Sequence, residues 1–501
     1  MLNERLQNNV YKKTFWDKIV IQKFSQPIVI FFLLLSSLFV SVVIARGGVT
    51  IAISLLIVII ALPLLYVIVV FPQFGIIVFM IVSFIINDIS RFVPEVTPLG
   101  LVMDALTYLL ILGFFIKQKK EKRWDYFQDP ISYYILGWLT YNLFEVINPS
   151  ASSMLAWVYT VRTVAFLMLM YFVFVFHIRS KHFIKIIFKV WLALELIAAM
   201  SAFQQEFFGF FGFEKRWLNA DPLRIPLLFI DGHMRKFGIF SDPVVFAFNM
   251  VTGALICISF ITGKIKVYKK VILTFMMCFF LTMMLYSGTR AAFVLVPVAL
   301  VMFAILKYNR RYLIAVTVSG LLLGFLIKVP SSNQTLVRFQ TAFKPSKDAS
   351  FNVRAENQRR IKPYILSHPI GGGLGSVGIW GQRFSPNSYL AKFPPDSGYV
   401  RVAVEMGWIG LLLFCLFNFV VLYKGISYFF FIKDPDLKTC CLAMILVIFA
   451  FDVGNYPQQA FVQYPSNILF YLAMAILNVA MRLDIEQRNL QPGITPVKFT
   501  S

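Results

Sequence analysis

Long apolar runs separated by short polar segments make up most of the chain from residue 27 onward. A transmembrane helix needs about 20 mostly apolar residues to cross about 30 Å of hydrocarbon. Fourteen runs approach this length. The third run is short, and only Pro72 and its neighbours separate it from the second. The pattern therefore predicts an all-α polytopic membrane protein with 12–14 transmembrane helices. The runs are 27–45, 50–71, 73–87, 99–117, 131–148, 155–176, 183–203, 240–262, 268–286, 290–307, 312–328, 398–424, 437–453 and 464–482.

The composition supports this prediction. Hydrophobic residues make up 59% of the chain and charged residues only 14%, whereas soluble proteins are about 45–50% apolar and about 25% charged. A soluble enzyme could not bury so much apolar surface in one core, so that class is excluded. The five cysteines lie in apolar runs without ligand spacing, and we expect neither a disulfide framework nor a bound metal.

The charge is strongly positive, with 47 basic and 24 acidic residues and a net charge of +23. Basic residues concentrate in alternate loops, which is the bias of cytoplasmic loops in membrane proteins. We therefore expect both termini to be cytoplasmic, and we expect no nucleic acid partner. The basic loops are 117–123, 177–182, 263–270, 307–311 and 424–438.

Two segments on the opposite side are long. The longer one contains aromatic and apolar residues, and Asn352–Leu366 has the spacing of a helix that lies on the membrane surface. The expected organisation is a cytoplasmic N-terminal segment (1–26), a transmembrane domain (27–328) with an outer loop (204–239), a large extracytoplasmic loop (329–397), C-terminal transmembrane helices (398–482) and a cytoplasmic tail (483–501).

The outer turn Ser287–Arg290 carries an arginine against the charge bias. One interpretation is a snorkelling Arg290 with Thr289 capping the next helix. The other is an anion clamp, since guanidinium binds phosphate oxygens in bidentate fashion. Both remain open from the sequence.

A second group of cations precedes the eighth apolar run. Asp242 or Ser241 followed by Pro243 is an ordinary helix start. That start does not explain the neighbouring Arg235 and Lys236, which lie near Arg224 and His233 in the sequence, so we regard Arg235, Lys236 and Arg224 as phosphate-binding candidates.

The large outer loop ends in a run rich in arginine and glycine. Residues 373–378 formally match a dinucleotide-binding motif, but no βαβ unit surrounds them, and we reject that interpretation. The glycines instead allow the backbone to approach the membrane, another helix or a ligand. Asp396 is either the N-cap of the following helix or a carboxylate base beside arginines. His368 is either a surface residue or a base.

Together these motifs resemble the O-antigen ligase and Wzy-type polymerase superfamily, in the order and on the membrane side typical of that family. The resemblance implies a GT-C-like membrane glycosyltransferase of the bacterial inner membrane that uses undecaprenyl-diphosphate-linked glycan at its extracytoplasmic face. It further implies that arginines hold the diphosphate and a base deprotonates the acceptor, without a metal ion or cofactor. The matching segments are Phe237–Phe246, Ser287–Ala292, Arg354–Gly375 and Asp396–Gly410.

One departure concerns the position where ligases of this family carry a histidine, because this chain has Asp396 followed by Ser397. The difference favours a polysaccharide polymerase over a ligase that transfers glycan to lipid A-core. We expect Asp396 and Arg290 to be catalytic. Expected substrate contacts are Arg235, Lys236, Arg224, Arg354, Arg359, Arg360, His368 and Tyr399.

The expected partners are the lipid-linked glycan, a glycan or lipid acceptor, membrane lipids, a chain-length regulator and a flippase. The alternatives are a secondary transporter and an export scaffold. A transporter is less favoured because the charged candidates cluster at one face and the two halves show no correspondence. A scaffold would not need arginines in the outer turn.

Overall fold

The structure, a computed structural model, describes residues 63–93, 99–230, 232–343 and 349–490, together with parts of 26–45. The chain divides into two compact units, Met1–Val67 and Ile68–Ser501, and the second carries every element discussed below. The candidate span at 50–71 lies mostly outside the described residues. Ten described helices are long and apolar enough to cross a membrane, which confirms the all-α polytopic fold class.

The helices of the second unit follow one another with almost no strand between them. They are α4 (Pro72–Ile89), α5 (Gly100–Glu121), α6 (Pro130–Phe144), α7 (Met154–Met168), α8 (Met170–His177), α9 (Lys181–Phe207), α10 (Gly212–Asn219), α11 (Arg224–Leu228), α12 (Pro243–Ile261), α13 (Val267–Tyr286), α14 (Arg290–Leu306), α15 (Arg310–Lys328), α16 (Gln334–Thr341), α17 (Ala349–Ser367), α18 (Gly378–Phe384), α19 (Gly398–Phe431), α20 (Pro435–Gly454) and α21 (Ser466–Asn489). The strands β1 (Phe229–Ile230) and β2 (His233–Met234) pair antiparallel, and the 3-10 helices are η2 (Trp124–Phe127), η3 (Glu145–Ile147) and η5 (Leu390–Lys392).

Several helices begin with an acidic cap followed by proline, as the sequence predicts for α12. The Asp242 carboxylate accepts hydrogen bonds from the backbone N–H groups of Val244 and Val245, at 2.8 and 3.0 Å. Pro243 occupies the first helical position, where a missing N–H costs nothing. Asp129 before α6 and Asp434 before α20 repeat this arrangement.

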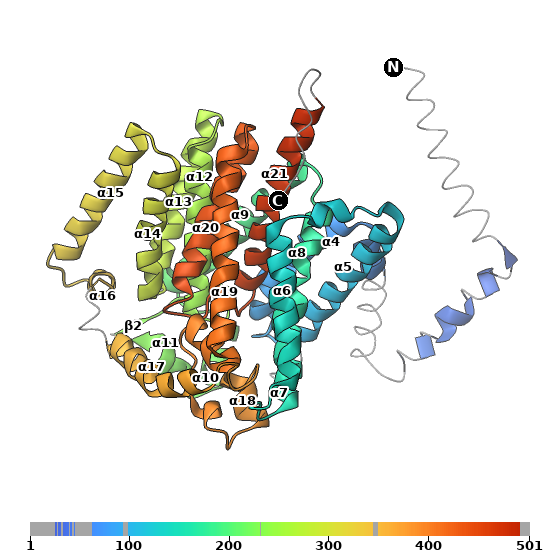
Figure 1. Cartoon of the computed structure of the whole chain (residues 1–501), viewed down its shortest axis with the longest axis horizontal. Coiled ribbons are helices and arrows are strands. Elements are labelled where there is room, and N and C mark those ends of the chain that lie inside the picture. The colour runs from blue at the N-terminus through green and yellow to red at the C-terminus, as the bar shows by residue number, and fades with distance from the viewer. Residues whose placement is uncertain are drawn as a thin grey trace. The chain divides into compact units, whose positions relative to one another are not determined.

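The core is built around α12, α20 and α21, whose side chains are almost all buried. These three helices lie side by side with α9, α13 and α19 around them (Figure 1). A polar contact joins two of the central helices, because the Asn249 amide of α12 donates to the Ser466 hydroxyl of α21 at 3.1 Å. In contrast, α15 has no buried residue among those described, as expected for a helix facing lipid.

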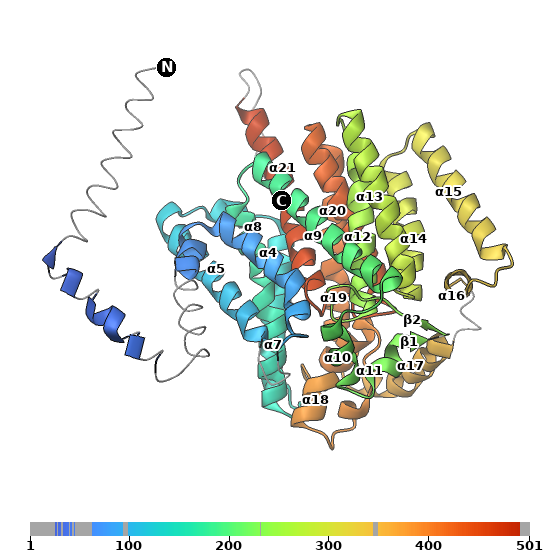
Figure 2. The ribbon, with the colours of Figure 1, turned by 180° about the vertical axis from the view of Figure 1, so that it is seen from behind.

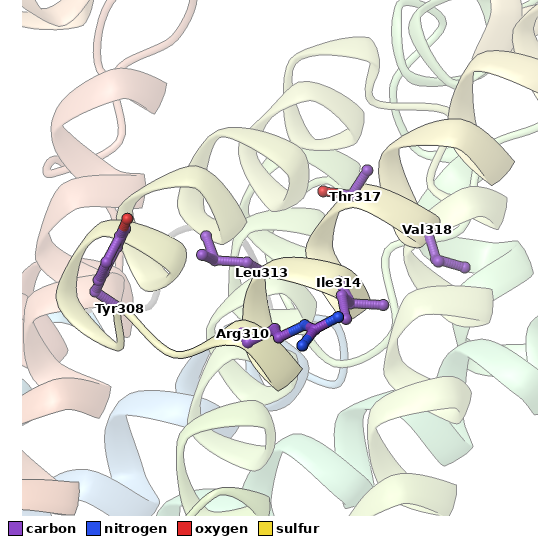
Figure 3. Close-up of a pocket in the computed structure, with 6 residues that line it drawn as sticks. All are labelled: Tyr308, Arg310, Leu313, Ile314, Thr317 and Val318. Carbon is purple, nitrogen blue, oxygen red and sulfur yellow. The ribbon is translucent and has the colours of Figure 1, made fainter.

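The basic loops meet at one end of the bundle. Arg179 forms an ion pair with Glu121 at 2.6 Å, and Lys185 forms one with Asp436 at the same distance. The turn between α14 and α15 adds a shallow groove of about 380 Å³ at this end (Figure 3). Its lining residues are Tyr308, Arg310, Leu313, Ile314, Thr317 and Val318.

The opposite end carries the folded segments that the sequence predicts to be extracytoplasmic. The elements α10, α11, α17 and α18 gather there together with the two short strands (Figures 1 and 2). The helix expected over Asn352–Leu366 is confirmed as part of α17. Arginines from three of the outer segments also lie at this end, and they form the candidate site described below.

Some helices differ from the runs that the sequence suggested. The run at 131–148 contains α6, which has only 15 residues, followed by η3. The run at 290–307 becomes α14, with 17 residues and a proline inside the helix. The run at 398–424 becomes α19, a helix of 34 residues that is interrupted at Gly407.

Candidate functional site

Arg235 reaches from the segment before α12 to the turn between α13 and α14. Its guanidinium Nε donates to the Ser287 carbonyl oxygen at 2.8 Å, and its Nη2 donates to the Thr289 hydroxyl at 3.0 Å. Burial, together with the positive charges of Arg338 and Arg290, lowers the pKa of Arg235 to about 10. Three arginines therefore lie close enough to influence one another.

Arg338 is a site residue that the sequence analysis missed. It lies on α16, and its Nε donates to the Gly288 carbonyl oxygen at 2.7 Å. Asn333 caps the start of α16 by accepting from the N–H groups of Thr335 and Leu336. The sequence signal was weak, because a single arginine in a long loop does not reveal which turn it contacts.

Gly288 lies between Arg235 and Arg338, the two arginines that donate hydrogen bonds to the turn between α13 and α14. Its φ of +60° is a left-handed conformation that favours glycine. A Cβ atom there would lie 2.9 Å from Arg338 Nε and 3.4 Å from Arg235 Cγ. The glycine is thus needed both for the shape of the turn and for the close approach of the two side chains.

Thr289 does not cap α14 with its side chain, so this interpretation is wrong. The residue occupies the N-cap position, but its side chain makes no cap hydrogen bond. The hydroxyl instead donates to the Pro243 carbonyl oxygen at 3.0 Å while it accepts from Arg235. Its role is to join the turn to the start of α12 and to orient the Arg235 guanidinium.

A narrow pocket opens between these arginines. It brings two guanidinium groups together with a third nearby, and guanidinium groups bind anions such as phosphate. Its volume of about 10 Å³ is that of about one water molecule, so the recess itself does not enclose a phosphate. Its lining residues are Ile230, His233, Arg235, Leu285, Gly288, Thr335 and Arg338.

Beside the pocket, one carboxylate contacts both Lys236 and His233. Glu206, near the end of α9, lies 3.2 Å from the Lys236 ammonium and 3.3 Å from the His233 Nε2 atom. Lys236 is almost completely buried, so its charge is committed to this ion pair. Sequence analysis did not identify Glu206, because 29 residues of intervening chain separate it from Lys236.

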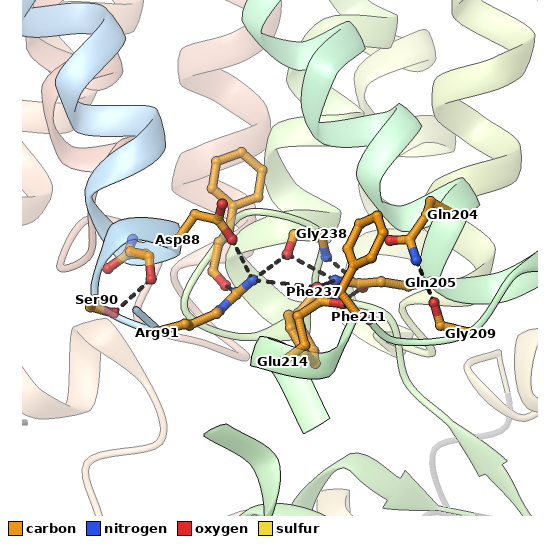
Figure 4. A network of polar contacts seen from close by, with 12 residues as sticks. Asp88, Ser90, Arg91, Gln204, Gln205, Gly209, Phe211, Glu214, Phe237 and Gly238 are labelled. Atoms are coloured by element: carbon orange, nitrogen blue, oxygen red, sulfur yellow. Dashed lines mark hydrogen bonds and ion pairs between the residues drawn. The ribbon is translucent and has the colours of Figure 1, made fainter. Parts of the chain in front are cut away.

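A buried network fixes the segment that carries Arg235. Arg91, after α4, donates to the carbonyl oxygens of Gly238 and Phe240 and pairs with Asp88 at 2.9 Å (Figure 4). The Gln205 side chain accepts from the Gly238 N–H at 3.0 Å and donates to Glu214 at 2.6 Å. Arg91 is therefore structural, and it holds the backbone that leads from the strands to α12.

The glycine-rich run packs into the break of α19. Gly407 has φ +70°, which interrupts the helix and frees backbone groups on both sides. The N–H of Gly372 donates to the Val404 carbonyl at 2.9 Å, and the Ile409 N–H donates to the Pro369 carbonyl at 3.2 Å. The approach of these glycines to another helix, expected from the sequence, is observed.

Asp396 lies immediately before α19 and is half-buried. The N-cap interpretation of Asp396 is wrong, because Ser397 occupies that position and accepts from the Val400 N–H at 3.4 Å. No ion pair joins Asp396 to an arginine in the part of the chain that the structure describes. Tyr399 donates its hydroxyl proton to the Asp452 carbonyl oxygen at 3.0 Å.

The remaining candidates lie outside the lining of the pocket. On α17, Arg359 and Arg360 are exposed, and Arg360 pairs with Glu356 at 3.0 Å, whereas Arg354 is half-buried. His368 stacks on Tyr364 with ring centroids 3.9 Å apart. Arg224 lies over the Trp217 ring, with its Cζ atom 4.4 Å from the ring centroid.

One protein-family model matches the segment of the chain that contains part of this site. Residues 274–415 match the family model described as O-Antigen ligase (Wzy_C). The matched segment begins inside α13 and ends inside α19, so it includes Arg290 and Arg338 but not Arg235. No curated protein matches the chain significantly. The family match confirms the resemblance to the O-antigen ligase and Wzy-type superfamily.

Proposed function

We propose that this chain, whose residues 274–415 match the O-Antigen ligase family model, polymerises glycan from undecaprenyl-diphosphate-linked donors at the extracytoplasmic face of the bacterial inner membrane. In this proposal the basic end of the bundle and both termini face the cytoplasm. The arginine end faces outward. Membrane lipids surround the bundle, and a flippase would deliver the donor to the outer face.

The observation that carries the proposal is the convergence of Arg235, Arg290 and Arg338 on one outer turn. Hydrogen bonds between ionised partners are worth roughly 1.5–3 kcal/mol each. A diphosphate leaving group develops negative charge as its bond to the sugar breaks, and fixed cations stabilise that charge. We propose that these arginines hold the diphosphate.

The substrate contacts expected elsewhere take a supporting role in this proposal. The α17 arginines, Arg354, Arg359 and Arg360, would contact phosphate or sugar from the edge of the outer surface. His368 precedes the glycine-rich segment and Tyr399 lies in the first turn of α19, and both would contact the glycan. Lys236 and Arg224 would add positive potential, since both already have protein partners.

The choice between polymerase and ligase rests on Asp396. Ligases of the family carry a histidine where this chain has Asp396, and we propose polymerase activity on that ground. The second candidate is a ligase that transfers glycan to lipid A-core, which the description of the matched family favours. A chain-length regulator would be a partner of the polymerase.

The test is a substitution in the producing bacterium. We expect Arg338→Gln to abolish normal surface glycan, because it removes a cation from the pocket. Arg311→Gln is the matched control, since Arg311 is an exposed arginine at the basic end. On gels, polymerase loss leaves single repeat units, whereas ligase loss leaves long chains on undecaprenyl diphosphate. Unchanged glycan with normal protein abundance would contradict the proposal.

A further inference from the structure

The groove beside the turn between α14 and α15 is large enough for part of a small molecule. Its volume of about 380 Å³ lies within the range of about 300–1,000 Å³ that is typical of ligand sites. The helix that forms most of its wall, α15, is long and apolar enough to cross a membrane, yet none of its residues is buried. In a bilayer, lipid molecules therefore have access to this wall.

The groove is polar at one end and mostly apolar along the rest of its length. Arg310 is the first residue of α15, and Tyr308 lies in the turn before it (Figure 3). Leu313, Ile314 and Val318 continue from Arg310 along the same face of the helix, at intervals of three and four residues. A phospholipid has the same order of polarity, with a head group at the membrane surface and acyl chains below it.

The cation at the polar end is not neutralised by the protein. Elsewhere at the basic end, Lys181 pairs with Asp434 and Lys185 pairs with Asp436. Within the part of the chain that the structure describes, the Arg310 side chain forms no ion pair and no hydrogen bond. Its guanidinium donors are therefore available to an anion that comes from outside the protein.

Further positive charge lies next to this turn. Lys307 ends α14, and the positive charge of Lys438 on α20 acts on it. Among the described residues, neither lysine has an acidic partner. The potential near the mouth of the groove is therefore positive, which favours an anionic occupant over a neutral one.

We propose that the groove is a binding site for an anionic phospholipid of the surrounding bilayer. The lipid phosphate accepts hydrogen bonds from the Arg310 guanidinium and the Tyr308 hydroxyl. One acyl chain lies along Leu313, Ile314 and Val318. This inference does not depend on the proposed function, because the groove and the arginine site lie at opposite ends of the bundle.

The charge and the shape of the polarity favour a phospholipid over other occupants. Basic side chains beside a membrane-spanning helix attract anionic head groups, and guanidinium binds phosphate oxygens. A soluble anion would contact Arg310 but leave the apolar wall uncovered. A second copy of this chain carries the same net charge of +23, and its basic end would be repelled by this one.

The experiment uses the full-length protein in phosphatidylcholine nanodiscs that contain a minor share of phosphatidylglycerol. The phosphatidylglycerol carries a photoactivatable group on one acyl chain, and cross-links to residues 308–318 are counted by mass spectrometry of peptides. A parallel sample carries the same label on phosphatidylcholine. The variants are Arg310→Gln, which removes the charge, and Thr317→Trp, which keeps the charge and fills the apolar part of the groove.

Each variant has a matched control on the same helix. Arg311→Gln removes an equal charge one residue further along, and Ser319→Trp adds equal bulk on another face of α15. Both control positions are exposed and neither lines the groove. Thermal unfolding of every variant verifies that the fold is retained.

We expect labelled phosphatidylglycerol to cross-link to the groove more than labelled phosphatidylcholine does. Arg310→Gln should lower the phosphatidylglycerol cross-links by about fivefold, the effect of one basic side chain near an anionic membrane surface. Thr317→Trp should remove most of them as well. Arg311→Gln and Ser319→Trp should stay close to the wild type.

Equal labelling by the two lipids in the wild type would overturn the inference. So would equal losses in Arg310→Gln and Arg311→Gln, because they would indicate a diffuse attraction to the surface without a site. Cross-links between two copies of the chain at residues 308–318 would identify a protein contact instead. Protection of the groove by unlabelled undecaprenyl phosphate but not by unlabelled phosphatidylglycerol would identify a different lipid and would also overturn it.

Discussion

Arg235 and Ser287 are joined by a hydrogen bond of 2.8 Å from the guanidinium Nε to the carbonyl oxygen, although 52 residues separate them in the chain. The same guanidinium also donates to the Thr289 hydroxyl. Two anchors fix the plane of the group, so its remaining N–H donors have a defined direction.

The first prediction concerns Arg235→Lys. Lysine keeps the charge but lacks the planar fork, so it cannot bond both anchors and still present paired donors to phosphate. We expect turnover with lipid-linked glycan to fall by about tenfold or more. Arg311→Lys is the control, and equal turnover of the two variants would show that charge alone is sufficient at position 235.

The second prediction concerns the break in α19. In Gly407→Ala, the new Cβ would lie 1.9 Å from the Pro369 carbonyl oxygen, at a φ of +70°. Left-handed strain costs roughly 1–2 kcal/mol and overpacking typically about 1–3 kcal/mol. We expect a clear drop in the thermal unfolding temperature in detergent. Gly320→Ala is the control, because no heavy atom lies within 4 Å of that Cβ position.

A third prediction concerns the network under the outer loop. The Arg91 side chain is 1% exposed and pairs with Asp88, and it donates to two carbonyl oxygens. Breaking a buried ion pair on one side costs about 3–5 kcal/mol. We expect Arg91→Gln to lower the unfolding temperature strongly. Arg123→Gln should change it little, because the Arg123–Asp125 pair is solvent-exposed; equal effects would refute a structural role for Arg91.

A fourth prediction concerns alkaline pH. The charged form of Arg235 binds phosphate, and burial lowers its pKa to about 10. Its charge is therefore complete below about pH 9 and is lost as pH rises through about 10. We expect the affinity for undecaprenyl diphosphate to be constant from pH 8 to 9 and to weaken above pH 10. In Arg235→Gln the affinity should be weaker throughout, with a shallower alkaline decline; an identical decline would contradict this assignment.

Much of the fold followed from the hydropathy of the chain. Apolar runs of the right length became helices from α4 to α21, and the Asp242–Pro243 start of α12 formed as its residue types predict. The interpretation succeeded because a membrane-spanning segment must satisfy its own backbone hydrogen bonds, and only helices do so within one segment.

The site was only partly predictable. Arg235 and Arg290 stood out because they oppose the charge bias, and the structure brings both to one turn. Arg338 and Glu206 were missed, since their contacts depend on how α16 and the end of α9 pack, which no local pattern encodes. Thr289 was misassigned because a tertiary contact to Pro243 replaced the local cap.

The most direct test of the central claim is the affinity of purified full-length protein for undecaprenyl diphosphate. Loss of one charge-assisted hydrogen bond, worth roughly 1.5–3 kcal/mol, corresponds to about 10-fold or more in Kd. We predict that Arg338→Gln raises Kd by at least this factor while Arg311→Gln binds like the wild type. Equal affinities of the wild type and Arg338→Gln would contradict the claim that these arginines hold a diphosphate.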